Sequence, residues 1–223
     1  MPIYQLDDDI WFPPHGASEI DILAVGGDLK AERLITAYAS GIFPWYDEPG
    51  EIYWWSPQAR CILFTQDLRV SKSMRNVLNR RDFRVTMDTS FNAVVEGCRS
   101  GERVNNTWIH NEVVAAYKEL FALGLAHSVE VWRDNKLIGG LYGVSLGHAF
   151  FGESMFTTEN NASKIALIYL SRWMKEMGWK LIDCQVYNDH LGSLGAKNIP
   201  REDFLSLLEI ELKYPTLKGP WKF

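Results

Sequence analysis

The sequence has few cysteines and no long apolar run, and both absences narrow the class of protein. Its cysteines, Cys61, Cys98 and Cys184, are far apart and odd in number, so neither a disulfide framework nor a zinc knuckle fits them. No segment reaches the roughly 18 apolar residues that a membrane span requires. The first residues lack the basic and apolar regions of a signal peptide. We therefore expect a cytoplasmic protein with no membrane segment.

The sequence also lacks internal repeats, low-complexity tracts and heptads. Apolar residues make up 47% of the 223 residues and charged residues 23%, which predicts a packed globular core rather than disorder. This length allows one large domain, or a medium domain with a small satellite. Without a heptad or an extended apolar edge, we expect a monomer.

Basic residues are fewer than acidic residues, but they are concentrated in one stretch of the chain. The net charge is −5, yet residues 69–84 carry six basic side chains against Asp82, so this stretch is +5 and the remainder −10. A basic island on an acidic protein is typical of a local contact with a polyanion. Helical spacing places Lys72, Arg75, Asn76 and Asn79 on one face, with Arg80 at its edge. An amphipathic surface helix with no ligand explains the same pattern.

Residues 1–60 are rich in turns and aromatic residues and predict a small N-terminal domain. Asp28 is a candidate N-cap for a helix that runs toward Ser40, with Gly41 as its C′ residue. The following segment, GIFPWYDEPGEIYWWSP, contains three prolines and resembles a loop.

Residues 61–223 alternate between strand and helix patterns. A three-stranded antiparallel meander is predicted over residues 127–156, with turns at Asp134-Asn135 and near Gly147. Strands are also expected at CILF, FRVTM and KLIDCQV, and helices over residues 71–81, 89–98, 111–123, 161–177, 188–194 and after Pro200. The fold class is therefore α+β (mixed α/β), with a central, mainly antiparallel sheet. Hairpin, strand, long helix, strand is the core order of the acyl-CoA N-acyltransferase fold.

The start of the long helix argues against coenzyme A. Such enzymes hold the pyrophosphate in a glycine-rich loop where helix amides meet the anion. Here the junction reads GESMFTTENNASK, without clustered glycines and with Glu153 and Glu159, whose carboxylates would repel a pyrophosphate. We expect no cofactor.

One strand carries the polar residues of greatest interest. Asp183 and Gln185 are two apart on the strand KLIDCQV, so strand periodicity places them on one face and Cys184 on the other. A structural hydrogen bond at a strand end explains the pair without any chemistry. A Cys184 nucleophile with His190 as base is the rival hypothesis, but we favour a core position for Cys184. Asp183, Asp189 and His190 match no tight set of metal ligands, so we expect no metal.

Seven short motifs resemble one known family and run in the expected order over nearly the whole chain. They are FPW at 43–45, WWSP at 54–57, TWI at 107–109, GES at 152–154, NASK at 161–164, LIDCQV at 181–186 and NDH at 188–190. In these motifs the chain resembles the leucyl/phenylalanyl-tRNA–protein transferases. The resemblance implies a small N-terminal domain, an acyltransferase-like C-terminal domain, and transfer of Leu or Phe, less readily Met, from tRNA to an N-terminal Arg or Lys. The product would be a degradation signal.

The resemblance also assigns roles to residues. Asp183 and Gln185 would be the catalytic pair; because an amide is a poor base, we expect Gln185 to orient the incoming amine. The terminal adenosine would be held by Trp45, Trp108, Glu153 and Phe150. The acyl pocket would consist of Leu141, Leu167, Leu170, Met174 and Ile182, although periodicity alone makes the helical members ordinary core. The tRNA backbone would contact Lys72, Arg75, Arg80 and Arg81.

Two other functions are compatible with the residues. One is an acyl-CoA-dependent N-acyltransferase on the same fold, which the absent glycine loop opposes. The other is a non-catalytic RNA-binding protein, which leaves Asp183 and Gln185 without a role.

Overall fold

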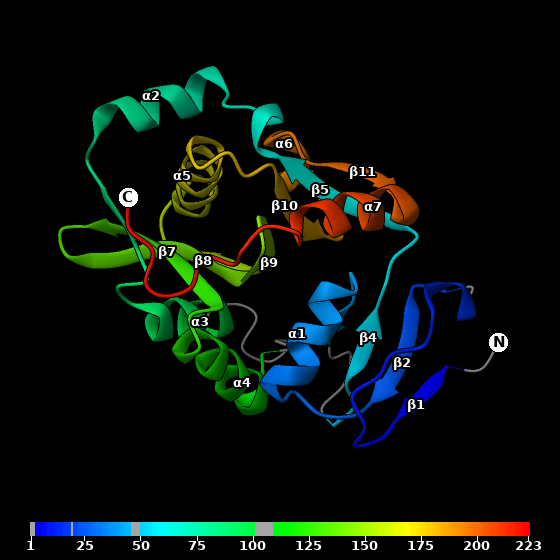
Figure 1. Cartoon of the computed structure of the whole chain (residues 1–223). Coiled ribbons are helices and arrows are strands. Elements are labelled where there is room, and N and C mark those ends of the chain that lie inside the picture. The colour runs from blue at the N-terminus through cyan, green and yellow to red at the C-terminus, as the bar shows by residue number, and fades with distance from the viewer. Residues whose placement is uncertain (1–2, 19, 46–49, 101–108) are drawn as a thin grey trace.

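The computed structural model describes residues 3–18, 20–45, 50–100 and 109–223, and Figure 1 traces the chain from end to end. These residues form a mixed α/β fold. The helices are α1 Ala31–Ala39, α2 Lys72–Arg80, α3 Phe91–Arg99, α4 Asn111–Ala122, α5 Ala162–Glu176, α6 Asp189–Ser193 and α7 Arg201–Glu211. The strands are β1 Tyr4–Leu6, β2 Ile22–Gly26, β3 Phe43–Trp45, β4 Tyr53–Trp55, β5 Ala59–Phe64, β6 Arg84–Met87, β7 Ala126–Arg133, β8 Lys136–Leu146, β9 Ala149–Thr157, β10 Leu181–Gln185 and β11 Lys197–Pro200. No helix among them is long and apolar enough to cross a bilayer.

The N-terminal segment contains a small sheet that the sequence did not predict. Its strands are ordered β1-β2-β4-β3, and each has only three to five residues, too few for a clear alternating pattern. Helix α1 begins at Ala31, later than expected, because Asp28 caps the preceding turn by accepting the Lys30 N–H at 2.9 Å. Gly41 follows the helix with φ +71°, as expected of a C′ glycine.

The large sheet contains the strands expected beyond residue 60 together with β11, and its seven strands are ordered β11-β5-β10-β9-β8-β7-β6. Strands β7, β8 and β9 form the predicted antiparallel meander, and the turn residues Asp134 and Asn135 adopt positive φ values of 48° and 60°. Among the described strands of this sheet only β9 and β10 pair in parallel, so the sheet is mainly antiparallel. Strand β11 was not predicted; it is short and pairs at the edge with β5.

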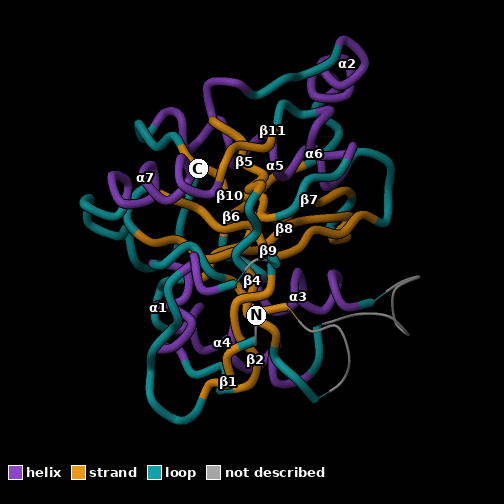
Figure 2. The backbone as a smooth tube through the Cα atoms, turned by 90° about the vertical axis from the view of Figure 1, so that its right-hand side faces the viewer, coloured by secondary structure: helices purple, strands orange, loops and turns teal. Residues whose placement is uncertain are grey.

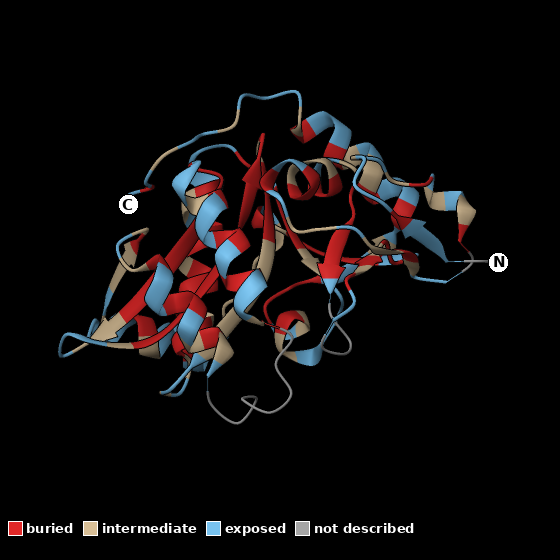
Figure 3. Ribbon diagram, turned by 90° about the horizontal axis from the view of Figure 1, so that it is seen from below, coloured by how far each residue is buried: buried red, intermediate tan, exposed pale blue. Residues whose placement is uncertain are grey.

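Helices cover both faces of the large sheet. Helices α3 and α4 lie on one face together with α1 and the small sheet, whereas α5 and α2 lie on the other, as Figures 1 and 2 show from two directions. Each face has its own apolar cluster, and the buried residues follow the sheet and the inner sides of the helices (Figure 3). The first cluster joins side chains of the N-terminal segment to those of the large sheet, including Trp54, Tyr38, Tyr117 and Phe151.

Strands β9 and β10 separate partway along their length, and this opening positions the candidate site. Their pairing ends at Phe151 and Asp183. Beyond that point each strand contains a register shift: Glu153 falls between two ladder pairs of β8 and β9, and Gln185 has φ +61° next to a shift against β5. Bulges re-aim side chains that regular pleating would direct elsewhere. Here they bring Glu153 and Gln185 toward each other across the opening.

Candidate active site

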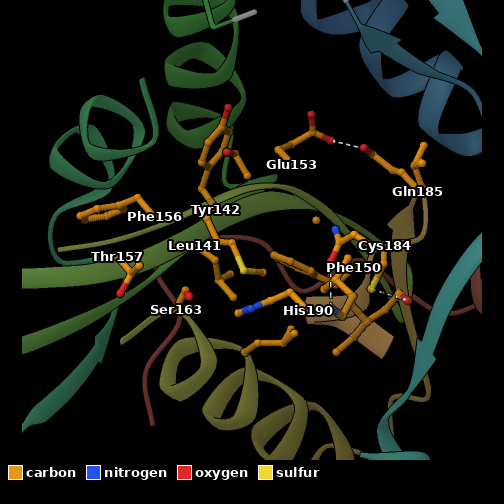
Figure 4. A pocket seen from close by; sticks show the side chains of 18 of the residues that line it. Leu141, Tyr142, Phe150, Glu153, Phe156, Thr157, Ser163, Cys184, Gln185 and His190 are labelled. Carbon is orange, nitrogen blue, oxygen red and sulfur yellow. Dashed lines mark hydrogen bonds between the residues drawn. The ribbon is translucent and has the colours of Figure 1, made fainter. Parts of the chain in front are cut away.

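A pocket of about 620 Å³ lies at the opening between β9 and β10. Its walls come from β3, β8, β9, β10, α5 and α6, so segments far apart in the sequence meet there. Figure 4 shows Glu153 and Gln185 facing each other on one side of the pocket, with Leu141, Phe150 and His190 on the other. The pocket therefore combines a polar side with an apolar side.

The polar side is built around the carboxyl group of Glu153. Gln185 Nε2 donates to Glu153 Oε1 at 3.0 Å, Tyr38 Oη to the same oxygen at 2.7 Å, and Tyr117 Oη to Glu153 Oε2 at 2.6 Å. Burial raises the pKa of Glu153 to about 7, although the hydrogen bonds from Tyr117, Tyr38 and Gln185 act in the opposite direction. The Asp183 charge raises this pKa further. Glu153 can therefore gain or lose a proton near neutral pH.

Asp183 does not line the pocket. It has no exposed surface and forms a two-point ion pair with Arg60, with Nε to Oδ1 at 2.8 Å and Nη2 to Oδ2 at 2.6 Å. The rings of Phe43 and Phe204 each lie 4.6 Å from the Arg60 guanidinium carbon. Asp183 Oδ1 also accepts the backbone N–H of Gln185 at 2.9 Å. Asp183 thus fixes the backbone of Gln185 from behind.

The expectation that Asp183 and Gln185 share one strand face is wrong. Cys184 and Gln185 both line the pocket, and Asp183 faces away from it. The reason is local: the left-handed φ of Gln185 and the adjacent register shift break the two-residue alternation at the strand end.

Two of the aromatic residues proposed for the adenosine lie at the pocket. Trp45 is 37% exposed, lines the pocket, and packs against Trp55 with 5.4 Å between ring centroids. Phe150 also lines it, whereas Phe151 packs on Tyr38 on the opposite face of β9, so only one of the two neighbours faces the pocket, as expected. Trp108 lies outside the described residues. Trp45 is therefore available to stack against a planar ligand.

The apolar side of the pocket contains Leu141, Leu167 and Ile182, but two other residues predicted with them lie elsewhere. Leu170 and Met174 have no exposed surface and belong to the core between α5 and the sheet. Only the first half of α5, at Ser163 and Leu167, borders the pocket, so the apolar stripe of the helix continues beyond the pocket's edge. The spacing correctly placed these side chains on one face, but that face is longer than the cavity.

Cys184 and His190 also border the pocket, contrary to the expected core position of Cys184. The contact with the Cys61 thiol and burial raise the pKa of Cys184 well above its usual range, which disfavours the thiolate that a nucleophile requires. Burial and Lys164 lower the pKa of His190, so its ring is neutral at pH 7. The site therefore offers a thiol and a neutral imidazole rather than an activated Cys–His pair.

Helix α2 has the predicted amphipathic form and lies apart from the pocket lining. Ser71 caps it by accepting the Met74 N–H at 3.1 Å, and Met74 and Leu78 are buried. Four cationic residues are exposed: Lys72, Arg75, Arg80 and Arg81. Of these, Arg81 also borders a smaller hollow beside Arg84 and Trp132. The helix therefore presents positive charge to solvent.

Sequence reasoning missed three residues that hold the carboxyl groups of Glu153 and Asp183. Tyr38 lies in α1, Tyr117 in α4 and Arg60 at the start of β5, and each is buried. Arg60 before an apolar strand was the one available signal, because an arginine that is buried needs a carboxylate partner. The tyrosines gave no signal, since their spacing fits ordinary helix core.

This arrangement suits an enzyme that holds an apolar group beside a centre able to exchange protons. A family model described as leucyl/phenylalanyl-tRNA protein transferase matches residues 62–209, and a model for the N-terminal domain of that family matches residues 27–58. The chain belongs to the leucyl/phenylalanyl-tRNA–protein transferase family, and so to the aminoacyltransferases.

Individual relatives agree with this assignment over nearly the whole chain. The leucyl/phenylalanyl-tRNA–protein transferase of Syntrophus aciditrophicus is 55% identical over 99% of this chain and 94% of its own length. That of Flavobacterium johnsoniae is 51% identical over 93% of this chain and 99% of its own length. Among solved structures, L-PGS from Bacillus licheniformis is 12% identical, covers 56% of this chain and 45% of its own, and has a TM-score of 0.41, too low to support an argument.

Proposed function

We propose that this protein transfers Leu or Phe, and less readily Met, from aminoacyl-tRNA to the α-amino group of proteins that begin with Arg or Lys, which marks them for degradation. Family membership supports the reaction class. The observation that carries the proposal is the pocket itself, where an exposed indole, an apolar wall and a polar pair lie within one cavity.

In this proposal each side of the pocket has one task. Trp45, with Trp108 and Phe150, holds the terminal adenosine by stacking, an interaction worth about 1–3 kcal/mol per base. Leu141, Leu167 and Ile182 receive the apolar side chain of the activated residue, while Leu170 and Met174 support them from the core. Such a pocket excludes charged acyl groups because burying an unpaired charge is costly.

The reacting groups need positioning rather than a cofactor. Ester aminolysis is downhill, so we propose a reaction without ATP or metal. Gln185 orients the attacking amine through its amide oxygen, since its Nε2 is engaged by Glu153. Asp183 acts as a positioning residue that holds the Gln185 backbone. The exposed cations of α2, Lys72, Arg75, Arg80 and Arg81, contact the tRNA phosphates.

We propose that residues 1–60 form a small N-terminal domain and residues 61–223 an acyltransferase-like (GNAT-like) domain. The chain order of the β7–β8 hairpin, β9, the long helix α5 and β10 matches the core order of that fold and supports the second assignment. The protein is proposed to act as a monomer in the cytoplasm, where aminoacyl-tRNA is made.

One assay tests the reaction. Labelled Leu-tRNA or Phe-tRNA is incubated with a peptide that begins with Arg, without ATP, coenzyme A or added metal. We expect label on the peptide, none on the same peptide with an acetylated N-terminus, and none on a peptide that begins with Glu. Acetyl transfer from acetyl-CoA with no transfer from tRNA would instead favour an acyl-CoA-dependent enzyme. Tight tRNA binding without transfer would favour an RNA-binding protein.

A further inference from the structure

Three hydrogen-bond contacts around Glu153 close into a ring. Tyr38 Oη lies 2.7 Å from Glu153 Oε1, Tyr117 Oη lies 2.6 Å from Glu153 Oε2, and the two phenol oxygens lie 2.5 Å apart. Both tyrosines are fully buried, one from α1 and one from α4. The carboxyl group thus bridges two phenols that also contact each other.

The ring has three oxygen–oxygen contacts, but the two phenols supply only two protons. Each oxygen–oxygen contact of this length needs a proton between its atoms, because two bare lone pairs at that distance repel. Tyr38 and Tyr117 supply one proton each. With a third proton on the carboxyl group of Glu153, the three contacts are filled in sequence around the ring: Glu153 donates to one phenol, that phenol donates to the other, and the second phenol donates back to Glu153. Burial raises the pKa of both phenols well above their usual range, so they keep their own protons.

The groups around the ring differ from Glu153 in their surroundings. Asp183 is buried and paired with Arg60. Tyr142 packs edge-on against Tyr117, and its hydroxyl has no hydrogen-bond partner among the described residues. On the pocket side, the pKa of Cys184 is raised and that of His190 lowered, so both are neutral at pH 7. The pKa of Glu153 itself is about 7, set mainly by burial.

We propose that Glu153, held in this ring by Tyr38 and Tyr117, is the proton acceptor for the incoming α-ammonium group. The inference rests on the proposed function and names a further catalytic residue of the same site. The ammonium gives one proton to the Glu153 carboxylate and becomes a neutral amine. The amine attacks the ester carbonyl, the carbon–nitrogen bond forms, the carbon–oxygen bond to the ribose breaks, and the second amine proton goes to the ribose oxygen. Glu153 then releases its proton to solvent.

The pKa values of the proton donor and the proton acceptor are close, which favours this assignment. A peptide α-amine has a reference pKa of about 7.7–8.0, so transfer to a group near 7 is almost balanced. Asp183 does not suit the role, because it is sealed behind the strand and engaged by Arg60. Gln185 does not suit it either, because an amide is a poor base.

The test is the pH dependence of single-turnover transfer to an Arg peptide, with the affinity for aminoacyl-tRNA measured separately. At saturating aminoacyl-tRNA, where weaker binding of the adenosine cannot account for a loss, Glu153→Gln should lower the rate about 100-fold or more. Tyr117→Phe removes a hydrogen bond to the charged form of Glu153, which should raise the pKa of Glu153. The inflection of the pH profile should therefore move to higher pH, and the rate that is lost at pH 7 should be regained at more alkaline pH. Tyr142→Phe, a matched buried tyrosine without a hydrogen bond to Glu153, should leave the inflection in place.

The acceptor amine titrates identically in every variant, so any shift between variants belongs to the protein. A Glu153→Gln protein that weakens tRNA binding but keeps the wild-type rate and profile would overturn the inference and assign Glu153 to the adenosine. An unmoved profile in Tyr117→Phe would also overturn it. If the wild-type protein transfers no residue at all, the proposed function fails instead, so the two failures are distinguishable.

Discussion

Arg60 and Asp183 form a two-point ion pair in which both side chains are almost completely buried. The pair joins β5 to β10 directly behind Gln185, and its partner rings come from β3 and α7. The charge that fixes the site is therefore separated from the pocket by the strand itself. This position makes Asp183 part of the support for the site.

Removing one partner of this pair should cost far more stability than removing both. Arg60→Met leaves a buried carboxylate without its counter-charge, and we expect the free energy of unfolding to fall by about 3–5 kcal/mol. The double variant Arg60→Met, Asp183→Leu should regain much of that loss, because no unpaired charge remains. Urea unfolding of the two variants checks this. Equal losses in the single and double variants would contradict it.

Gln185 should affect transfer without affecting the fold. Its side chain borders the pocket and holds Glu153, and it belongs to neither apolar cluster of the described residues. We expect Gln185→Ala to lower single-turnover transfer about 100-fold, since a misplaced reacting group costs about that much, with unchanged urea unfolding. Gln66→Ala, an exposed glutamine remote from the pocket, is the matched control. A normal rate in Gln185→Ala would remove this residue from the mechanism.

Leu167 and Leu170 lie one turn apart on α5, yet only Leu167 lines the pocket. Leu167→Ala should enlarge the acyl pocket and raise the ratio of Phe to Leu transfer about tenfold or more. Leu170→Ala should lower the free energy of unfolding by about 2–5 kcal/mol and leave the ratio unchanged. Competition between Phe-tRNA and Leu-tRNA measures the ratio. A change of ratio in Leu170→Ala alone would show that the pocket extends deeper along α5.

The charge of α2 should govern tRNA affinity. Reversing Lys72 and Arg75 to Glu should raise the KM for aminoacyl-tRNA and reduce the slope of log KM against log salt by about one for each phosphate that the helix no longer neutralises. Lys118→Glu, an exposed cation on α4 on the opposite face of the sheet, should change neither quantity. Identical slopes in the wild-type protein and the α2 variant would place the tRNA elsewhere.

Glu153 should make stability depend on pH. Its folded-state pKa of about 7 lies above the ordinary value of 4.5. The folded state therefore binds more protons than the unfolded state between these values, and the free energy of unfolding should fall as the pH rises from about 4.5 to about 7. Glu153→Gln should lack this part of the decrease. Urea unfolding at pH 5 and pH 8 measures it, and parallel decreases in both proteins would refute the assignment.

The sequence by itself determined the local elements and the family. The β-rich runs of β7 to β9, the Asp134-Asn135 turn, the long helix and the amphipathic α2 follow from side-chain patterns that act over a few residues. The ordered motifs likewise identified the family, because they are read along the chain without knowledge of its folding.

Only the tertiary structure decided how the site is assembled. The two tyrosine partners of Glu153 and the arginine partner of Asp183 come from α1, α4 and β5, between 36 and 123 residues away in the sequence, and such distances leave no periodic signal. The bulges at Glu153 and Gln185 override the alternation that periodicity predicts, because ladder pairing with neighbouring strands sets the register. The spacing of apolar residues predicted the apolar stripe of α5. Where the pocket ends along this stripe depends on how α5 packs on the sheet, which the spacing does not contain.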